Sequence, residues 1–310
     1  MSNFAGKSYM PMLLRTDVQN GFLNLFSKIM ENEPLWNGNK LNLFALKITN
    51  NCFSYETLTE ELGNILTTYA LSRSTYDELC SQKKYASLVK KAKEKLRKVE
   101  NNDGELGEIL LYCMLESHLN APKLLTKLEL KTAANNYVNG ADGVHLLKID
   151  DSTYQFVFGE SKLNSDLRTG IYEAFKSINT LLENGLNKLR YEISLVNSNI
   201  LKETATEESV ILKKLLIPTE NDEDLNIDHS FGIFLGFDIP ISEEERKMKN
   251  SDFRTLMNGK IEKAVRGVLT TLNEQIKKRE FVGYSFYIYI IPFSELGITR
   301  KKIIENLKTM

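Results

Sequence analysis

The chain is poor in the residues that form disulfide-rich or zinc-stabilised folds. Its 310 residues include only three cysteines and three histidines. The cysteines, Cys52, Cys80 and Cys113, show no paired spacing. A disulfide framework and a structural zinc site are therefore not expected, and three reduced thiols suit a cytoplasmic protein.

The sequence also lacks membrane and targeting segments. No apolar run approaches the length needed to span a bilayer, and residues 1–7 lack the apolar core of a signal peptide. We expect a cytoplasmic protein without membrane contact. Glycine-rich nucleotide fingerprints, P-loops and internal repeats are missing too, so any ATP chemistry would belong to another chain.

Neither sign of charge is in excess. The sequence has 40 Lys and Arg residues against 41 Asp and Glu residues, which gives a formal net charge of −1 at pH 7. This balance excludes a globally basic DNA-binding protein, so contact with nucleic acid must come from a local patch or from a partner. The hydrophobic content of 42% and the charged content of 26% are ordinary for a soluble globular protein.

The length allows one large domain or two modest ones. We place a boundary at Asn101-Asn102-Asp103-Gly104, where turn-forming residues interrupt the pattern. Residues 1–100 are then an α+β region, with a strand at 41–48 and a helix at 55–69. We expect this region to contact a partner or DNA, and residues 101–310 to form the main domain.

Residues 81–99 predict a strongly basic amphipathic helix. Its apolar residues follow a helical period, and its lysines crowd the other faces. One interpretation is a solvated helix packed on the core. The other, of about equal weight, is a face that contacts phosphates through residues that include Lys90, Lys91 and Lys93.

Residues 140–163 carry the most informative pattern. They predict a β-hairpin in which Asp142 begins the first strand, and Glu160 and Lys162 end the second. Because side chains alternate along a strand, Glu160 and Lys162 lie on one face and Ser161 points away.

The position of Asp142 depends on the turn. A three-residue loop at 150–152 would place Asp142 opposite Glu160, whereas a two-residue loop would place it on the other face unless a bulge intervenes. Two carboxylates and a lysine can hold a divalent metal beside a phosphodiester. The alternative is a surface ion pair at a strand end. The second strand is apolar on both faces apart from Gln155, as a buried central strand should be, and this favours a site.

A helix at 104–118 precedes the hairpin and begins with acidic residues. Such residues complement the positive end of a helix dipole, which explains them without a functional site. One of them could instead be a further metal ligand. Glu108 is better placed for this than Glu105, because it lies inside the apolar run of the helix.

A second helix, at 167–182, follows the hairpin. Arg168, Tyr172 and Lys176 fall at positions i, i+4 and i+8, on a face away from its apolar stripe. A line of basic, aromatic and basic side chains beside a metal site suits a DNA backbone. Ordinary surface residues would give the same pattern.

The order of the expected elements is helix, three strands and helix, then a later strand, helix and strand. Their ranges are 104–118, 124–132, 142–149, 154–162, 167–182, 231–239, 252–278 and 284–291. This order resembles the core of the PD-(D/E)xK nuclease superfamily, with Asp142, Glu160 and Lys162 on its motif positions and Ala141 in place of its proline. The fold implied is α/β, a restriction-endonuclease-like core with a mixed central sheet flanked by helices and an N-terminal α+β extension.

Three short motifs resemble, more specifically, the HamA family of nuclease subunits from the bacterial Hachiman antiphage system. They are Gly-Glu-x-Gly-Glu at 104–108, Gly-Ala-Asp-Gly-Val-His at 140–145 and Phe-Gly-Glu-Ser-Lys at 158–162. The resemblance implies a DNA-cleaving effector that acts in a heteromeric complex with HamB, a superfamily 2 helicase. Asp142 and Glu160, with Glu108 as a further candidate, would bind Mg²⁺ or Mn²⁺, and Lys162 would orient water or stabilise phosphoryl charge. The alternative is a catalytically inactive nuclease-like subunit that binds DNA or serves as a scaffold.

Overall fold

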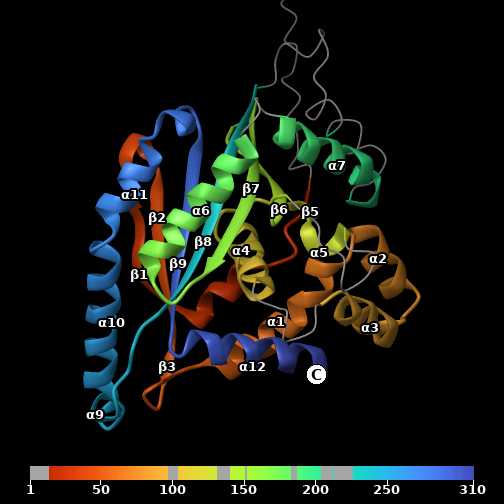
Figure 1. Ribbon diagram of the computed structural model, residues 1–310. Helices are drawn as coiled ribbons and strands as arrows, with labels where there is room; N and C mark the ends of the chain where they lie inside the picture. The colour runs from red at the N-terminus through yellow and green to blue at the C-terminus, as the bar shows by residue number, and fades with distance from the viewer. Residues whose placement is uncertain are drawn as a thin grey trace, which may run out of the picture.

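The computed structural model describes residues 14–96, 104–130, 140–150, 152–182, 187–203, 212 and 226–310 (Figure 1). A seven-stranded sheet with the order β1-β2-β9-β8-β7-β6-β5 forms its centre. The strands are β1 (Phe26–Pro34), β2 (Lys40–Leu46), β5 (Lys123–Thr126), β6 (Gly143–Lys148), β7 (Thr153–Leu163), β8 (Asn226–Asp238) and β9 (Ser285–Phe293). Strands β2, β9, β8 and β7 run parallel, and the remaining pairs are antiparallel. The expected α/β class with a mixed sheet is confirmed.

Helices cover both faces of the sheet (Figure 1). They are α1 (Tyr55–Ala70), α2 (Arg73–Ser81), α3 (Tyr85–Lys95), α4 (Glu105–Ser117), α5 (Lys127–Leu130), α6 (Leu167–Leu182), α7 (Asn187–Glu203), α9 (Glu243–Arg246), α10 (Asn250–Arg266), α11 (Leu269–Ile276) and α12 (Leu296–Thr309). Helices α4 and α6 both pack on β7 and β8, from opposite sides. A two-stranded ribbon of β3 (Ile48–Thr49) and β4 (Cys52–Phe53) lies outside the main sheet. Among the described helices, none is long and apolar enough to cross a membrane.

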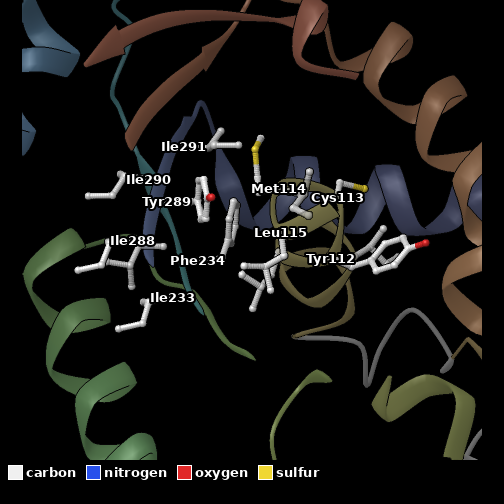
Figure 2. Packing of buried hydrophobic residues seen from close by; sticks show 14 of the residues in the cluster. Tyr112, Cys113, Met114, Leu115, Ile233, Phe234, Ile288, Tyr289, Ile290 and Ile291 are labelled. Atoms are coloured by element: carbon white, nitrogen blue, oxygen red, sulfur yellow. The ribbon is translucent and has the colours of Figure 1, made fainter. Parts of the chain in front are cut away.

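Helix α4 lies close to the sheet because two glycines are adjacent beneath it. Gly159 on β7 pairs with Gly232 on β8. A Cβ on Gly159 would lie 3.0 Å from a methyl group of Leu111, and one on Gly232 would lie 2.9 Å from a methyl group of Leu115. Figure 2 shows Leu115 beside Phe234 in the buried layer on this side of the sheet. Because the two glycines have no side chains, α4 can pack closely on the end of β7 that carries the candidate site.

Helix α6 has the bounds expected from its apolar spacing, 167–182. Asp166 caps its first turn, since its Oδ1 accepts the N–H of Thr169 at 2.7 Å. Its buried stripe, which includes Ile171, Phe175 and Ile178, faces the sheet. Lys176 and Ser177 of α6 line the same cavity as Asp142 and Glu160.

The expected boundary near residue 100 does not divide the sheet. Strand β2 pairs with β9, with Leu41 opposite Ile288, so residues from both expected regions form one sheet and one core. Phe44 on β2 also stacks on Tyr289 of β9, with ring centroids 6.5 Å apart. Residues 97–103, where the boundary was placed, lie outside the described residues.

Three expected elements differ from the structure. The helix expected at 81–99 is wrong, because α2 ends at Ser81, Lys83 adopts a φ of 55° and α3 spans only Tyr85–Lys95. The break at Lys83 separates the two helices, and Leu88 and Ala92 are buried residues of the second one, α3. The expected end of that helix, 97–99, lies outside the described residues.

The strand expected at 124–132 is also wrong beyond its first residues. Strand β5 ends at Thr126, whose hydroxyl accepts the N–H of Glu129 at 3.1 Å and so caps the short helix α5. Residues 131–132 lie outside the described residues. The single helix expected at 252–278 divides at Gly267 and Val268 into α10 and α11.

Candidate functional site

Strands β6 and β7 form the expected hairpin. Strand β6 pairs with β7 from Val144 opposite Phe158 to Lys148 opposite Tyr154. The N–H of Ile149 donates to the carbonyl of Thr153 at 2.9 Å, so the pairing extends one residue beyond Lys148. The paired register toward the site ends at Val144 opposite Phe158, and Asp142 lies beyond it. The alternatives that the sequence leaves open for the face of Asp142 depend on a loop whose Asp151 lies outside the described residues.

Asp142 is held by β7 and α5. Its N–H donates to the carbonyl of Gly159 at 2.9 Å. Its Oδ2 accepts the N–H and the hydroxyl of Ser161, both at 2.8 Å, and its Oδ1 lies 3.3 Å from Nζ of Lys127. Only 9% of the residue is exposed. The carboxylate is therefore fixed at the start of β6 by two hydrogen bonds and one ion pair.

Glu160 and Lys162 form an ion pair on the face of β7 that α6 covers. Their Oε1 and Nζ atoms are 2.6 Å apart, and Glu160 is 6% exposed. Burial, and next the negative charge of Asp142, raise the pKa of Glu160 to about 7, although Lys162 and the hydroxyl of Ser177 oppose the shift. Burial would lower the pKa of Lys162, but the charges of Glu160 and Asp142 outweigh it and raise that pKa.

These three side chains open into a cavity of about 700 Å³ between the hairpin, α6 and α7. Its carboxylates include Asp142, Glu160 and Glu192. Its lysines are Lys127, Lys162, Lys176 and Lys188. Buried carboxylates with lysines around them can bind a cation at the floor of the cavity and phosphate oxygens at its rim.

Glu108 lies on the other side of β7. A Cβ on Gly107 of α4 would lie 3.1 Å from Oγ of Ser161, so α4 covers the face toward which Ser161 points. Oε2 of Glu108 accepts the hydroxyl of Tyr69 at 3.3 Å. Glu105 is buried in the same first turn. The structure thus brings Asp142, Glu160 and Lys162 together, but it leaves Glu108 outside the residues that line the cavity.

The negative charges of Glu108 and Asp142 nevertheless both act on the hydroxyl of Tyr69. Burial, followed by the charges of Glu108, Asp142 and Glu105, raises the pKa of the Tyr69 hydroxyl well above its ordinary value. The charge of Asp142 thus raises the pKa of Tyr69, which contacts Glu108 of α4, and also the pKa of Glu160. Within the described part of the chain, no three or more His, Cys, Asp or Glu side chains form a group that could hold a metal. The role of Glu108 as a ligand stays a prediction.

The three α6 residues expected to contact DNA have different surroundings. Arg168 donates to the hydroxyl of Thr271 and, at 3.1 Å, to the carbonyl of Gly267, so it joins α6 to the α10–α11 turn. Tyr172 is exposed, and Lys176 lines the cavity. Only Lys176 of the three therefore lies at the site.

The three α3 lysines lie away from the cavity. Lys90 and Lys91 are exposed, and Lys90 pairs with Glu94 at 3.8 Å. Lys93 lines a second hollow of about 290 Å³, together with residues of α1 and α12. The α3 helix is an exposed basic surface whose contact with DNA stays a prediction.

Three further residues of the cavity, Glu192, Lys127 and Lys188, carry no motif in the sequence. Glu192 is 4% exposed on α7, and burial raises its pKa to about 7. Lys127 begins α5, in a stretch expected to be a strand. The one local signal was Gly140, directly before Ala141 and Asp142, because its φ of 133° is one that side-chain-bearing residues rarely adopt.

The comparison with protein families agrees with this architecture. The HamA family model matches residues 20–307. The match runs from the start of the 3₁₀ helix at Asn20–Leu25 into α12, so it spans all seven strands and every residue of the site. No curated protein matches the chain. Because the family model covers nearly the whole sequence, the chain belongs to the HamA family and is a protein of the Hachiman defence system.

Proposed function

We propose that this chain is a metal-dependent deoxyribonuclease, the DNA-cleaving subunit of its defence complex. The observation that carries the proposal is that Asp142, Glu160 and Lys162 line one cavity. Two carboxylates can hold a metal that assists the hydrolysis of a phosphodiester, and a lysine can stabilise the charge that develops on the phosphoryl oxygens. The membership of the HamA family gives the biological setting.

The donor atoms fit Mg²⁺ or Mn²⁺. Asp142 and Glu160 offer hard carboxylate oxygens, and the charge of Asp142 contributes to the raised pKa of Glu160, so a cation beside both would relieve their repulsion. Mg²⁺ is usually held by one or two carboxylates, with waters and substrate phosphates as the other ligands. A third protein ligand is therefore not required, although Glu108 remains a candidate. When bound, the metal would stabilise transition-state charge and lower the pKa of the attacking water.

Lys162 would stabilise charge on the phosphoryl oxygens. Its ammonium group lies 2.6 Å from Oε1 of Glu160. With a cation held by the two carboxylates, the flexible stem of Lys162 would let its charge turn toward the phosphate. Lys127 likewise forms an ion pair with Asp142. Lys176 and Lys188, from α6 and α7, would hold the neighbouring phosphates at the rim of the cavity.

The chain would act with the helicase HamB. Its net charge of −1 provides no general affinity for DNA, and its sequence contains no P-loop. A helicase subunit would supply both the ATP-driven step and the delivery of DNA to the cavity. In this arrangement the partner senses or loads DNA and this chain cuts it.

The test uses the full chain, purified alone and with the helicase subunit. Cleavage of double-stranded DNA, single-stranded DNA and RNA is measured with and without Mg²⁺ or Mn²⁺, and Mn²⁺ binding is measured by calorimetry. Glu160→Gln and Lys162→Met should each lower DNA cleavage by about 100-fold or more. Glu262→Gln, which removes an exposed 2.8 Å ion pair with Arg266, is the matched control.

Two outcomes overturn the proposal. One is a well-folded Glu160→Gln, Lys162→Met double variant that still cuts DNA at the wild-type rate. The other is a wild-type complex that binds DNA but neither binds Mn²⁺ nor cleaves any of the three substrates, and this result would indicate an inactive scaffold. If the isolated wild-type chain cuts DNA as fast as the complex does, only the proposed regulation by the helicase is contradicted.

A further inference from the structure

Glu192 of α7 lies against the backbone of Gly140. A Cβ on Gly140 would overlap Oε1 of Glu192 and lie 2.9 Å from its Cδ. No side chain larger than hydrogen could occupy position 140 while Glu192 stays in place. The glycine two residues before Asp142 is therefore explained by the approach of the Glu192 carboxylate, which lies 52 positions later in the sequence.

The backbone N–H of Ala141 lies near enough to the same carboxylate to favour its charged form and so to lower its pKa. Ala141 is directly followed by Asp142, so Glu192 holds the peptide that leads into the candidate metal ligand. Lys127 joins the two acidic residues, because it pairs with Asp142 and its charge also acts on Glu192. The segment carrying Asp142 is consequently held by β7, α5 and α7.

The other end of α7 is anchored in a buried ionic network. Oε2 of Glu203 lies 3.2 Å from Nη1 of Arg73 on α2 and 3.7 Å from Nζ of Lys123 on β5. All three residues are buried. Removing one partner from such a network is costly, so the network fixes the position of α7 along its axis. Glu192 is then presented to Gly140 and Ala141 by a helix fixed at its far end.

We propose that Glu192 is a positioning residue, which fixes the Gly140–Ala141 segment so that the Asp142 carboxylate meets Glu160 in a geometry that binds the metal. This inference rests on the proposed nuclease function. It differs from a role for Glu192 as a metal ligand, because the essential contact is with a backbone N–H. A glutamine at this position can still accept a hydrogen bond from that N–H, but it is a poor ligand for Mg²⁺ or Mn²⁺.

The experiment compares Glu192→Ala and Glu192→Gln in the full chain, with Ser198→Ala as a control on the exposed side of α7. Three quantities are measured: hydrogen exchange at the Ala141 amide, the affinity for Mn²⁺, and cleavage of DNA by the helicase complex. Glu192→Ala should speed exchange at Ala141 and weaken Mn²⁺ binding and cleavage by about 10- to 100-fold, as loss of a group that orients a metal ligand typically does. Glu192→Gln should stay within about threefold of wild type in all three.

The outcomes separate this inference from the proposed function. Unchanged exchange at Ala141 in Glu192→Ala overturns the inference, whether or not the wild type cuts DNA. A Glu192→Gln variant that loses Mn²⁺ affinity as fully as Glu192→Ala, with Ala141 still protected, also overturns it and makes Glu192 a ligand. A wild-type protein that binds no Mn²⁺ contradicts the proposed nuclease function. Faster exchange at the Ala141 amide in Glu192→Ala would in that case still show that Glu192 positions the Gly140–Ala141 segment.

Discussion

Ser161 donates both its backbone N–H and its hydroxyl to one oxygen of Asp142, each at 2.8 Å. Ser161 is the middle residue of the Glu-x-Lys motif, and its side chain points away from Glu160 and Lys162. It therefore joins the two strands of the site: β7 supplies Glu160 and Lys162 and also fixes the carboxylate at the start of β6.

Replacing this hydroxyl should weaken the site without disrupting the strand. Ser161→Ala keeps the backbone donor and the Cβ that packs near Gly107, so the loss is one buried hydrogen bond, worth about 1 kcal/mol. We expect Mn²⁺ affinity and cleavage to fall by about tenfold or less, because a group that orients a ligand is lost while the ligand remains. Calorimetry and cleavage assays measure both effects. A variant with wild-type affinity would show that the backbone N–H alone positions Asp142.

The site could be predicted in part because its central residues are close in sequence. The hairpin joins Asp142 to Glu160 within about 20 residues, and strand alternation assigns the faces of Glu160 and Lys162. The spacing of the apolar residues in α6 gave its bounds directly. Glu192 could not be predicted this way, because tertiary packing alone brings α7 to Gly140.

The errors in the predicted fold have a similar cause. The periodicity of 81–99 is helical throughout, yet Lys83 adopts a left-handed conformation so that α3 can turn back onto α1. Likewise, Thr126 could extend a strand or cap a helix, and its hydrogen bond to the N–H of Glu129 decides for the cap. The pairing of β2 with β9 joins residues about 250 positions apart, and no local pattern indicates it.

Metal binding should depend on pH through Glu160. Its pKa is raised to about 7 by burial and by the charge of Asp142. Because a proton and a metal compete for the carboxylate, Mn²⁺ affinity should fall by up to tenfold for each pH unit below about 7. Titrations at pH 6, 7 and 8 test this expectation. Equal affinity at the three pH values would contradict Glu160 as a ligand that must lose its proton.

The same shift predicts how stability changes with pH. A carboxyl whose pKa is raised on folding binds its proton more tightly in the folded state, so its favourable contribution is complete below about pH 4.5 and is lost as the pH rises through about 7. Glu160→Gln removes this titration. Between pH 5 and pH 8, its free energy of unfolding relative to wild type should therefore increase by roughly 2–3 kcal/mol. Urea unfolding with a chelator present measures the difference, and a constant difference would contradict the prediction.

Two groups of lysines make separable predictions for DNA binding. Lys176→Glu with Lys188→Glu, at the rim of the cavity, should weaken binding and reduce the slope of log K against log salt by about 2. Lys90→Glu, Lys91→Glu and Lys93→Glu together test α3 in the same way. An unchanged salt slope in the α3 variant would identify that helix as a solvated face or a partner surface. An unchanged slope in the variant of Lys176 and Lys188 would show that these two lysines do not contact the DNA.

The last prediction concerns the region before residue 100. Deleting residues 1–100 removes β1, β2 and α1, and with them the strand that pairs with β9 and the ring of Phe44 that stacks on Tyr289. The edge of β9 and a large apolar face would be exposed. We expect the truncated chain to aggregate or to lose cooperative unfolding, as measured by thermal unfolding and size-exclusion chromatography. Its failure to bind the helicase would then reflect unfolding, so the docking surface has to be mapped by surface substitutions in the full chain. A soluble truncated protein with a sharp unfolding transition would instead support the separate N-terminal domain that the sequence predicts, and deletion would then become a valid test of docking.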